Sequence, residues 1–376
     1  MIGKLFRFSL FGESHGSGVG VIIYGCPPGI LVNYNELMNE LRKRMIEDRA
    51  LKSGRLEEDK VKILSGVFKG YTTGAPISIF IPNKDVNSEF YEKIRYTPRP
   101  SHADYVAYVK YKGFNDYRGG GMFSGRLTAP IVAAGYFAKK ILRQYNISIY
   151  AHVTRIGDVS VNKSITLDMI KNNVYKNPVR CADLETAQKM LSYVRSIRSG
   201  GDSVGGIVEV IALNVPVGLG EPPLDPLDGD IAKSVMIIPG VKGIEFGDGF
   251  ILAYGKGSEV NDPFIIRKGK ILTKTNRSGG INGGISNGMP IVFRVAFRPP
   301  PSIYLQQKTV DVKKRCEVTL KMKGRFDTCI APKALPILEA ITSIILVDHL
   351  LRFLAYSNGP NKHNQNFFRE VGDIGK

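Results

Sequence analysis

The chain has 376 residues, 43% of them hydrophobic, and carries 52 basic against 34 acidic side chains, a formal charge of +18. This length and apolar content support one large core or two modest ones and argue against a disordered chain. The charge fits a general basic bias, an anionic small-molecule ligand, or nucleic acid. Because the longest compact basic run is Lys313-Lys314-Arg315, without any nucleic-acid-binding motif, we predict no nucleic-acid partner.

Cysteine spacing and the apolar segments bear on metal content and location. None of the four cysteines has another within two to four residues, so we predict no metal site. Residues 1–9 are not followed by the apolar stretch of a signal peptide, and we expect a reduced, cytoplasmic protein. The most membrane-like stretch, residues 335–354, includes Glu339, Asp348 and His349. We therefore predict a buried core helix there and no membrane contact.

The first part of the chain alternates strand and helix patterns. In chain order the predicted elements are strands at 4–9 and 19–24, a helix at 35–48, strands at 61–67 and 76–81, and a helix from 128. Asn35 and Thr128 are the predicted helix caps. Leu37, Leu41 and Met45 lie one turn apart, which predicts that all three face the core.

The second part repeats this pattern loosely. Residues 164–199 are mostly helical and polar, and the elements then predicted are a strand at 204–213, a helix at 230–237, and strands at 244–253 and 290–297. An internal pseudo-repeat follows from this similarity. Neighbouring strands joined by short turns favour antiparallel pairing, and hence an α+β fold. We predict one domain over residues 1–356 and a mobile polar tail over residues 357–376.

Three short polar segments combine glycine with arginine or histidine: residues 12–16, 99–126 and 324–327. Glycine allows a ligand to approach the backbone, arginine binds phosphate and carboxylate, and histidine exchanges protons near neutral pH. Two of the five histidines, His15 and His102, fall in these segments. Either histidine alone is more often structural, but together they predict a site where proton chemistry is done on an anionic small molecule.

Glycine-rich segments supply candidate anion-binding loops. Residues 116–121 end in three glycines ahead of a predicted helix, whose N-terminus attracts phosphate. A flexible turn is the alternative. For the glycine-rich run at 278–288 an anion-binding loop and a flexible turn are again the alternatives. Residues 298–302, further along the chain, form a rigid proline-rich segment that carries a cation. Residues 16–20 do not match a dinucleotide-binding motif, because a strand and not a helix follows them.

Arg325 and Asp327 stand two residues apart, on one face of an extended segment. The arginine can bind an oxyanion while the aspartate accepts a proton. A surface ion pair or a helix cap explains the same spacing, so the sequence leaves both open.

Taken in order, these motifs resemble the signature regions of the chorismate synthase family. The matching segments run from about residue 3 to 351 and are Gly12-Glu13-Ser14-His15-Gly16, His102-Ala103-Asp104-Tyr105, Asp116-Tyr117-Arg118-Gly119-Gly120-Gly121, Gly324-Arg325-Phe326-Asp327 and Asp348-His349-Leu350-Leu351.

The resemblance implies a fold, a reaction and partners. It implies a layered α+β core, a β-α-β sandwich with helices between antiparallel sheets, assembled as a homotetramer. The implied reaction is the anti 1,4-elimination of phosphate from 5-enolpyruvylshikimate 3-phosphate, which gives chorismate, the last common precursor of the aromatic amino acids. Reduced FMN is required without net redox change. The flavin is reduced either by the chain itself with NADPH or by an external reductase.

The resemblance also implies roles for individual residues. The implied catalytic residues are His15 for the leaving phosphate, His102 for protonation of the flavin near N1, and Asp327, which works with flavin N5 on the ring hydrogen. The implied substrate-binding residues are Arg44, Arg49, Arg99 and Arg126. The implied flavin-binding residues are Ser124, Pro239, Gly240, Gly283, Arg298, Pro299, Pro300, Pro301, Ser302 and Arg325.

The chain departs from the family pattern at several positions. Met122, Ile131 and Ala50 stand where the family usually has arginine, although Arg49 lies next to Ala50. These changes predict weaker anion binding than in other members. They also support an alternative, a non-catalytic family member that binds flavin or another anion.

Overall fold

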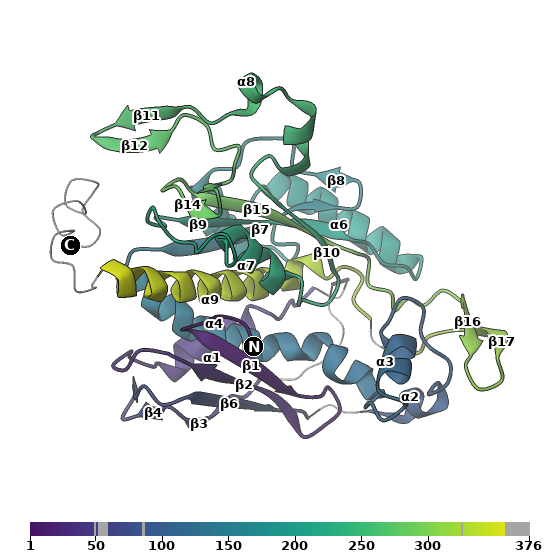
Figure 1. The fold of residues 1–376 in the computed structure, drawn as a ribbon. Coiled ribbons are helices and arrows are strands. Elements are labelled where there is room, and N and C mark those ends of the chain that lie inside the picture. The colour runs from purple at the N-terminus through teal and green to yellow at the C-terminus, as the bar shows by residue number, and fades with distance from the viewer. Residues whose placement is uncertain (49, 52–58, 85–86, 325, 358–376) are drawn as a thin grey trace.

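The fold is a three-layer sandwich in which long helices lie between two antiparallel sheets (Figure 1). The structure is a computed structural model that describes residues 1–48, 50–51, 59–84, 87–324 and 326–357. The central layer contains α4 (Thr128–Gln144) and α9 (Ala331–Ser357), which pack against each other. This arrangement confirms the predicted α+β class with helices between the sheets. The polar tail from residue 358 onward lies outside the described residues.

The N-terminal sheet has four strands in the spatial order β1-β2-β6-β3, all antiparallel. Its strands are β1 (Arg7–Gly12), β2 (Gly18–Tyr24), β3 (Lys62–Ser65) and β6 (Ile77–Pro82). Helix α1 (Tyr34–Arg42) packs on α4. The short strands β4 (Val67–Phe68) and β5 (Tyr71–Thr72) form a hairpin before β6.

The C-terminal sheet has five strands in the order β10-β15-β9-β7-β8. Its strands are β7 (Ser148–Ile156), β8 (Val159–Ser160), β9 (Gly206–Leu213), β10 (Val241–Phe246) and β15 (Ile291–Phe297). Its helices are α5 (Leu167–Asn173), α6 (Leu184–Ser199) and α7 (Leu227–Val235), of which α7 packs on α9.

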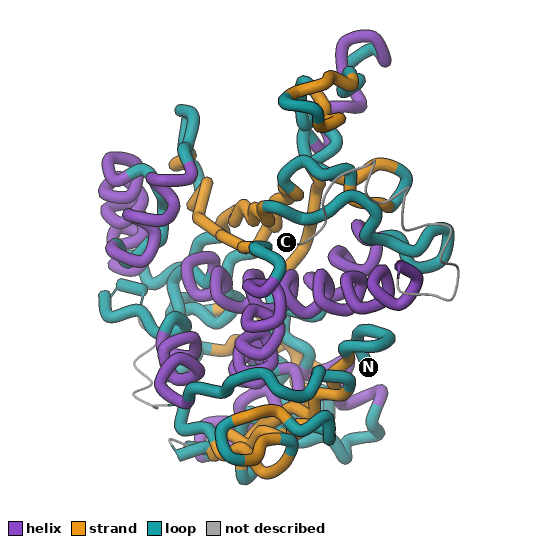
Figure 2. The backbone as a smooth tube through the Cα atoms, turned by 90° about the vertical axis from the view of Figure 1, so that its left-hand side faces the viewer, coloured by secondary structure: helices purple, strands orange, loops and turns teal. Residues whose placement is uncertain are grey.

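Shorter elements surround the sandwich, and two hairpins project from it (Figure 1); the hairpin at the top of Figure 1 is also at the top of Figure 2. The helical pieces are α2 (Glu89–Lys93), α3 (Asp104–Lys110), α8 (Gly257–Val260) and the 3-10 turns η1 (Arg118–Phe123), η2 (Gly125–Leu127), η3 (Val174–Lys176) and η4 (Gly249–Tyr254). The projecting hairpins are β11 (Phe264–Arg267) with β12 (Lys270–Thr273), and β16 (Gln307–Asp311) with β17 (Cys316–Leu320). A third hairpin joins β13 (Ile281–Asn282) and β14 (Ile285–Ser286).

The predicted pseudo-repeat is present in the topology, with a different boundary. Leaving aside shorter inserted elements, each half contains in this order two strands, a short helix, two more strands and a long helix. The four strands take the same spatial order in the two halves, β1-β2-β6-β3 and β7-β9-β15-β10. The second half begins at β7 and not at residue 204. Helices α5 and α6 are inserted between its first two strands and hide the repeat in the sequence.

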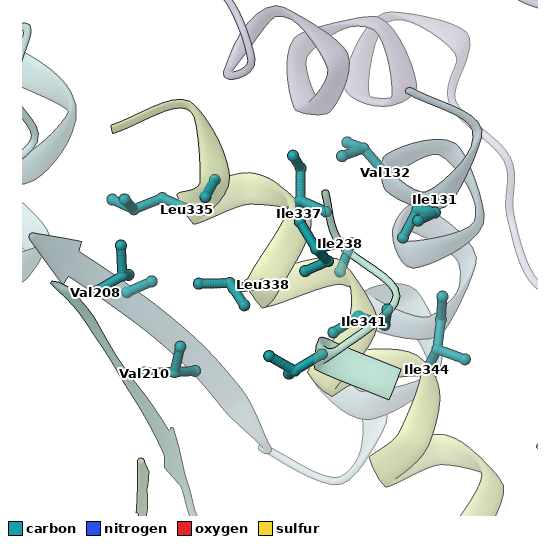
Figure 3. Close-up of a cluster of buried hydrophobic side chains, with 14 of the residues drawn as sticks. Ile131, Val132, Val208, Val210, Ile238, Leu335, Ile337, Leu338, Ile341 and Ile344 are labelled. Atoms are coloured by element: carbon teal, nitrogen blue, oxygen red, sulfur yellow. The ribbon is translucent and has the colours of Figure 1, made fainter. Parts of the chain in front are cut away.

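The hydrophobic core fills the space between the helices and both sheets, and Figure 3 shows the part of it in which side chains of α4, α9 and β9 meet. Ile131 of α4, Val208 of β9 and Leu338 of α9 are each at most 2% exposed. Helix α9 is long and apolar enough to span a membrane by composition, but it is almost wholly buried between the sheets. The prediction of a core helix at residues 335–354 is confirmed, because a helix covered on all sides is apolar all round.

Several predicted element ends were wrong. Helix α1 stops at Arg42 and is capped by Asn33, whose side chain accepts the backbone N–H groups of the next turn. Met45 therefore lies beyond the helix and is exposed. Thr128 does not cap α4, since its hydroxyl donates to the Gly125 carbonyl. Strand β10 ends at Phe246 and is followed by a 3-10 turn rather than continuing to residue 253.

Candidate functional site

A cavity of about 1180 Å³ opens where the two halves of the sandwich meet. Its lining comes from the β1–β2 loop, the segment after α1, Asp59 before β3, the region from α2 to the start of α4, residues 238–240 and 297–302, described residues between 320 and 327, and the start of α9. Sites for one small molecule usually enclose about 300–1,000 Å³. This cavity is larger than that range.

The cavity brings together the three polar segments found in the sequence. The predicted site residues that line it are His15, Arg44, Arg99, His102, Ser124, Arg126, Pro239, Gly240, Arg298, Pro300, Pro301, Ser302 and Asp327. Pro299 and Gly283 are not in the lining, and Gly283 lies in the turn between β13 and β14. Arg49 and Arg325 lie outside the described residues.

His15 is held on two sides. Its Nδ1 lies 2.8 Å from the Ser88 hydroxyl, and its ring meets the Tyr91 ring edge-on at 5.2 Å. Gly119 packs on the Nε2 side with φ +59°, where a Cβ atom would fall 2.4 Å from Nε2. Only glycine tolerates both that backbone conformation and that approach. The histidine is buried but still borders the cavity.

His102 lies between a carbonyl and a hydroxyl. Its Nδ1 is 3.0 Å from the Pro100 carbonyl oxygen, so Nδ1 carries the proton and donates it. Nε2 lies 2.9 Å from the Ser302 hydroxyl and is the acceptor in the neutral ring. Burial, followed by the positive charge of Arg99, lowers the pKa of His102 to about 4. The ring is therefore neutral at pH 7.

The pKa of His102 predicts a pH dependence of stability. Between pH 6.5 and 4 the unfolded chain binds a proton at this residue and the folded chain does not, so stability falls as the pH is lowered. The loss reaches up to about 3 kcal/mol at pH 4. Chemical denaturation of the wild type and of His102→Gln across this range is expected to show the steeper decline in the wild type. Equally steep declines in the two proteins would contradict the lowered pKa of His102.

Arg99 is fixed before any ligand arrives. Its guanidinium donates to both carboxylate oxygens of Asp104 at 2.7 Å and lies over the Tyr91 ring at 5.3 Å. Burial alone would raise the pKa of Asp104, but hydrogen bonds and charge from Arg99 outweigh it and hold this pKa below its usual range. Such bidentate pairs set the direction of the remaining donors. Arg99 thus presents a rigid cation to the cavity.

Asp327 follows β17 and lies beside the start of α9. Its carboxylate forms an ion pair with Lys333, in the first turn of α9. About a quarter of the Asp327 side chain is exposed, and both residues line the cavity. A carboxylate in this position can accept a proton from a bound molecule.

The electrostatic character of the cavity favours anions. The described lining holds eight lysines and arginines against five aspartates and glutamates. The first turns of α4 and α9 both line it, and the positive ends of their helix dipoles add to the charge. Ile131 and Ala50 are buried away from the lining, and Lys321 and Lys323 supply cations that the sequence did not single out. The predicted weaker anion binding stays a prediction.

Two further motifs, one rich in glycine and one containing a histidine, lie outside the cavity lining. The run at 278–288 does not line the cavity, and at Gly280 a Cβ atom would fall 2.4 Å from the Pro290 carbonyl oxygen, so glycine serves close packing there. Asp348 accepts the backbone N–H groups of residues 4–6 at 2.6–2.9 Å. His349 contacts Asp230 at 3.0 Å. Asp348 thus anchors the N-terminal segment to α9, and His349 links α9 to α7.

The sequence analysis did not find five residues that contact the predicted site residues and hold them in place. These are Asp59, Asn83, Ser88, Tyr91 and Lys333. Each contacts a predicted site residue, but none belongs to a local motif. No signal short of the fold itself indicates them.

An α+β sandwich whose cavity gathers cations, two histidines and a carboxylate defines an enzyme that does proton chemistry on a small anion. The family model described as chorismate synthase matches residues 6–351. A chorismate synthase from Pyrococcus abyssi is 54% identical over 93% of this chain and 97% of its own length. One from Thermococcus kodakarensis is 53% identical over 95% and 99%.

A solved structure described as a chorismate synthase crystal structure superposes with a TM-score of 0.74 at 31% identity, covering 94% of this chain and 93% of that one. The chain belongs to the chorismate synthase family, and its enzyme class is that of the lyases. The family predicted from the motifs is confirmed.

Proposed function

We propose that this chain converts 5-enolpyruvylshikimate 3-phosphate to chorismate and inorganic phosphate by 1,4-elimination. A carbon–oxygen bond to phosphate and a ring carbon–hydrogen bond break, and a new double bond forms. The observation that supports this most is that His15, His102 and Asp327 line a single cation-rich cavity although they come from distant segments. Relatives at 50–54% identity carry the same name, which favours catalysis over the non-catalytic alternative.

The charge of the cavity matches the charge of the substrate. The substrate carries one phosphate and two carboxylates, and oxyanions of this kind are bound best by arginine. Arg44, Arg99 and Arg126 line the cavity from three different segments of the chain. We assign them to substrate binding, together with Arg49, which is outside the described residues.

The residues present fit reduced FMN as the cofactor. Ile238, Phe297, Ile330 and Ile337 give the lining an apolar part suited to a planar ring, and Arg298 is a cation available to the flavin phosphate. The backbone N–H of Arg298 donates to the Gly240 carbonyl at 2.9 Å, which joins two of the predicted flavin-binding segments. When bound, reduced FMN supplies an electron-rich ring that the elimination needs although no net redox change occurs.

The remaining steps belong to protein side chains. His15 is assigned to donate a proton to the departing phosphate, and Ser88 fixes the ring for this through Nδ1. Asp327 is assigned to accept the ring proton, while its ion pair with Lys333 orients the carboxylate. His102 is neutral in the ligand-free chain and is assigned to protonation near the flavin once anions have entered.

Further properties of the family extend the proposal. They are assembly as a homotetramer, a cytoplasmic location, and flavin reduced either with NADPH or by an external reductase. The cationic cavity accounts for part of the net charge of +18 without a nucleic-acid partner.

The proposed function is tested by mixing the purified chain anaerobically with 5-enolpyruvylshikimate 3-phosphate and photoreduced FMN. Chorismate is followed by its ultraviolet absorbance. Product that forms with reduced and not with oxidised FMN is expected. Flavin binding without product would favour the non-catalytic alternative.

A further inference from the structure

One carboxylate in the cavity wall is shared by two arginines. Asp59 pairs through Oδ2 with Nη1 of Arg44 and through Oδ1 with Nη1 of Arg126. All three side chains are largely buried, with 17% of Arg44, 10% of Asp59 and 6% of Arg126 exposed. Two guanidinium groups this close repel each other unless an anion lies between them.

A second residue links this pair to the loop that carries His15. The Asn83 amide donates to the carbonyls of Glu13 and Gly16, both at 2.9 Å, on either side of His15. Its amide oxygen accepts from Nε of Arg126, also at 2.9 Å. Asn83 directly follows β6, so a strand end fixes both contacts. A continuous set of hydrogen bonds therefore runs from the His15 loop to Arg44.

Asp59 does not fully neutralise the arginine pair. A guanidinium has five N–H groups, and Arg44 is recorded donating to Asp59 and, at 3.2 Å, to the Thr128 hydroxyl. Its Nε is buried and has no hydrogen-bond partner among the described residues. Two positive charges against one negative charge leave a net charge of +1. An oxyanion in the cavity offsets this remaining charge.

We propose that Asp59 is a positioning residue that holds Arg44 and Arg126 together as one oxyanion-binding unit, which Asn83 places next to His15. The identity of the anion rests on the proposed function: it is the phosphate that His15 protonates as it leaves. Asp59 itself neither binds the substrate nor transfers a proton.

The test measures phosphate binding apart from catalysis. Inorganic phosphate, the expected product, is titrated calorimetrically into the wild type, Asp59→Asn and Asp59→Glu. Removing one partner of a buried charge pair is expected to raise the Kd for phosphate at least about tenfold in Asp59→Asn. The KM for 5-enolpyruvylshikimate 3-phosphate rises with it, whereas kcat changes less. Asp59→Glu keeps the charge and restores part of the affinity.

Asp48→Asn is the matched control. Asp48 lies on the same stretch between α1 and β3 and pairs with Arg195 at 2.9 Å, but it does not line the cavity. Its phosphate Kd is expected to equal that of the wild type. Thermal melts of each variant establish that the measured chains are folded.

Asn83→Ser provides an uncharged second variant in case Asp59→Asn does not fold. In this variant Arg44 and Arg126 still pair with Asp59, but the hydrogen bonds from residue 83 to the His15 loop are lost. We therefore expect kcat to fall about tenfold, while the Kd for phosphate changes less than about threefold. Unchanged kcat in this variant would overturn the link to His15.

The outcomes are separable. Equal or tighter phosphate binding by folded Asp59→Asn overturns the proposal, because Asp59 would then compete with the ligand. No phosphate binding by the wild type overturns it as well. Loss of phosphate affinity in Asp59→Asn, with no chorismate formed by the wild type, would support the positioning role and reject the proposed reaction.

Discussion

Asp327→Asn is expected to lower kcat by about 10²–10⁴-fold, the range for removal of a group that accepts a proton in the transition state. Asparagine has nearly the same shape but cannot take up the ring proton. The carboxylate is ion-paired with Lys333 and lies at the cavity wall, so its loss affects a proton acceptor and not the core. Steady-state kinetics with reduced FMN measure the effect, and KM for the substrate is expected to change little.

Asp311→Asn is the control for this prediction. Asp311 lies at the end of β16, accepts backbone N–H groups of its own turn and is absent from the cavity lining. Its kcat is expected to match the wild type. A kcat within about threefold of the wild type for Asp327→Asn would remove Asp327 from the proton transfer.

His15→Asn is expected to reduce kcat by about 10²–10⁴-fold as well, since phosphate leaves poorly without a proton. The asparagine amide reproduces the Nδ1 contact with Ser88, so the loop keeps its anchor while the donor is lost. Ser88→Ala tests the anchor separately and is expected to lower kcat by less than about tenfold.

The measurement is single-turnover release of inorganic phosphate with flavin already bound. Slow phosphate release in His15→Asn with ordinary substrate affinity supports the role of proton donor. An unchanged rate of release would show that another group, or water, protonates the phosphate.

The sequence determined which chemical groups the site contains. Glycine at 119, which must pack against His15 with positive φ, and the paired arginines and histidines are visible as motifs because their spacing within each segment is local. The strand alternation and the apolar run of α9 likewise indicated antiparallel strand pairs and a buried core helix, whereas the arrangement of helices between two sheets was implied by the family resemblance. Local sequence patterns are enough to predict a structural feature wherever backbone conformation or burial determines the residue type.

The tertiary structure decided how those groups are held together. Asp59 and Asn83 look like ordinary surface residues in the sequence, since their partners Arg126 and the His15 loop lie 43 to 70 positions away. The inserted helices α5 and α6 hid where the second repeat begins. Pairing between distant residues depends on which strand ends the fold brings side by side, and no local propensity encodes that information.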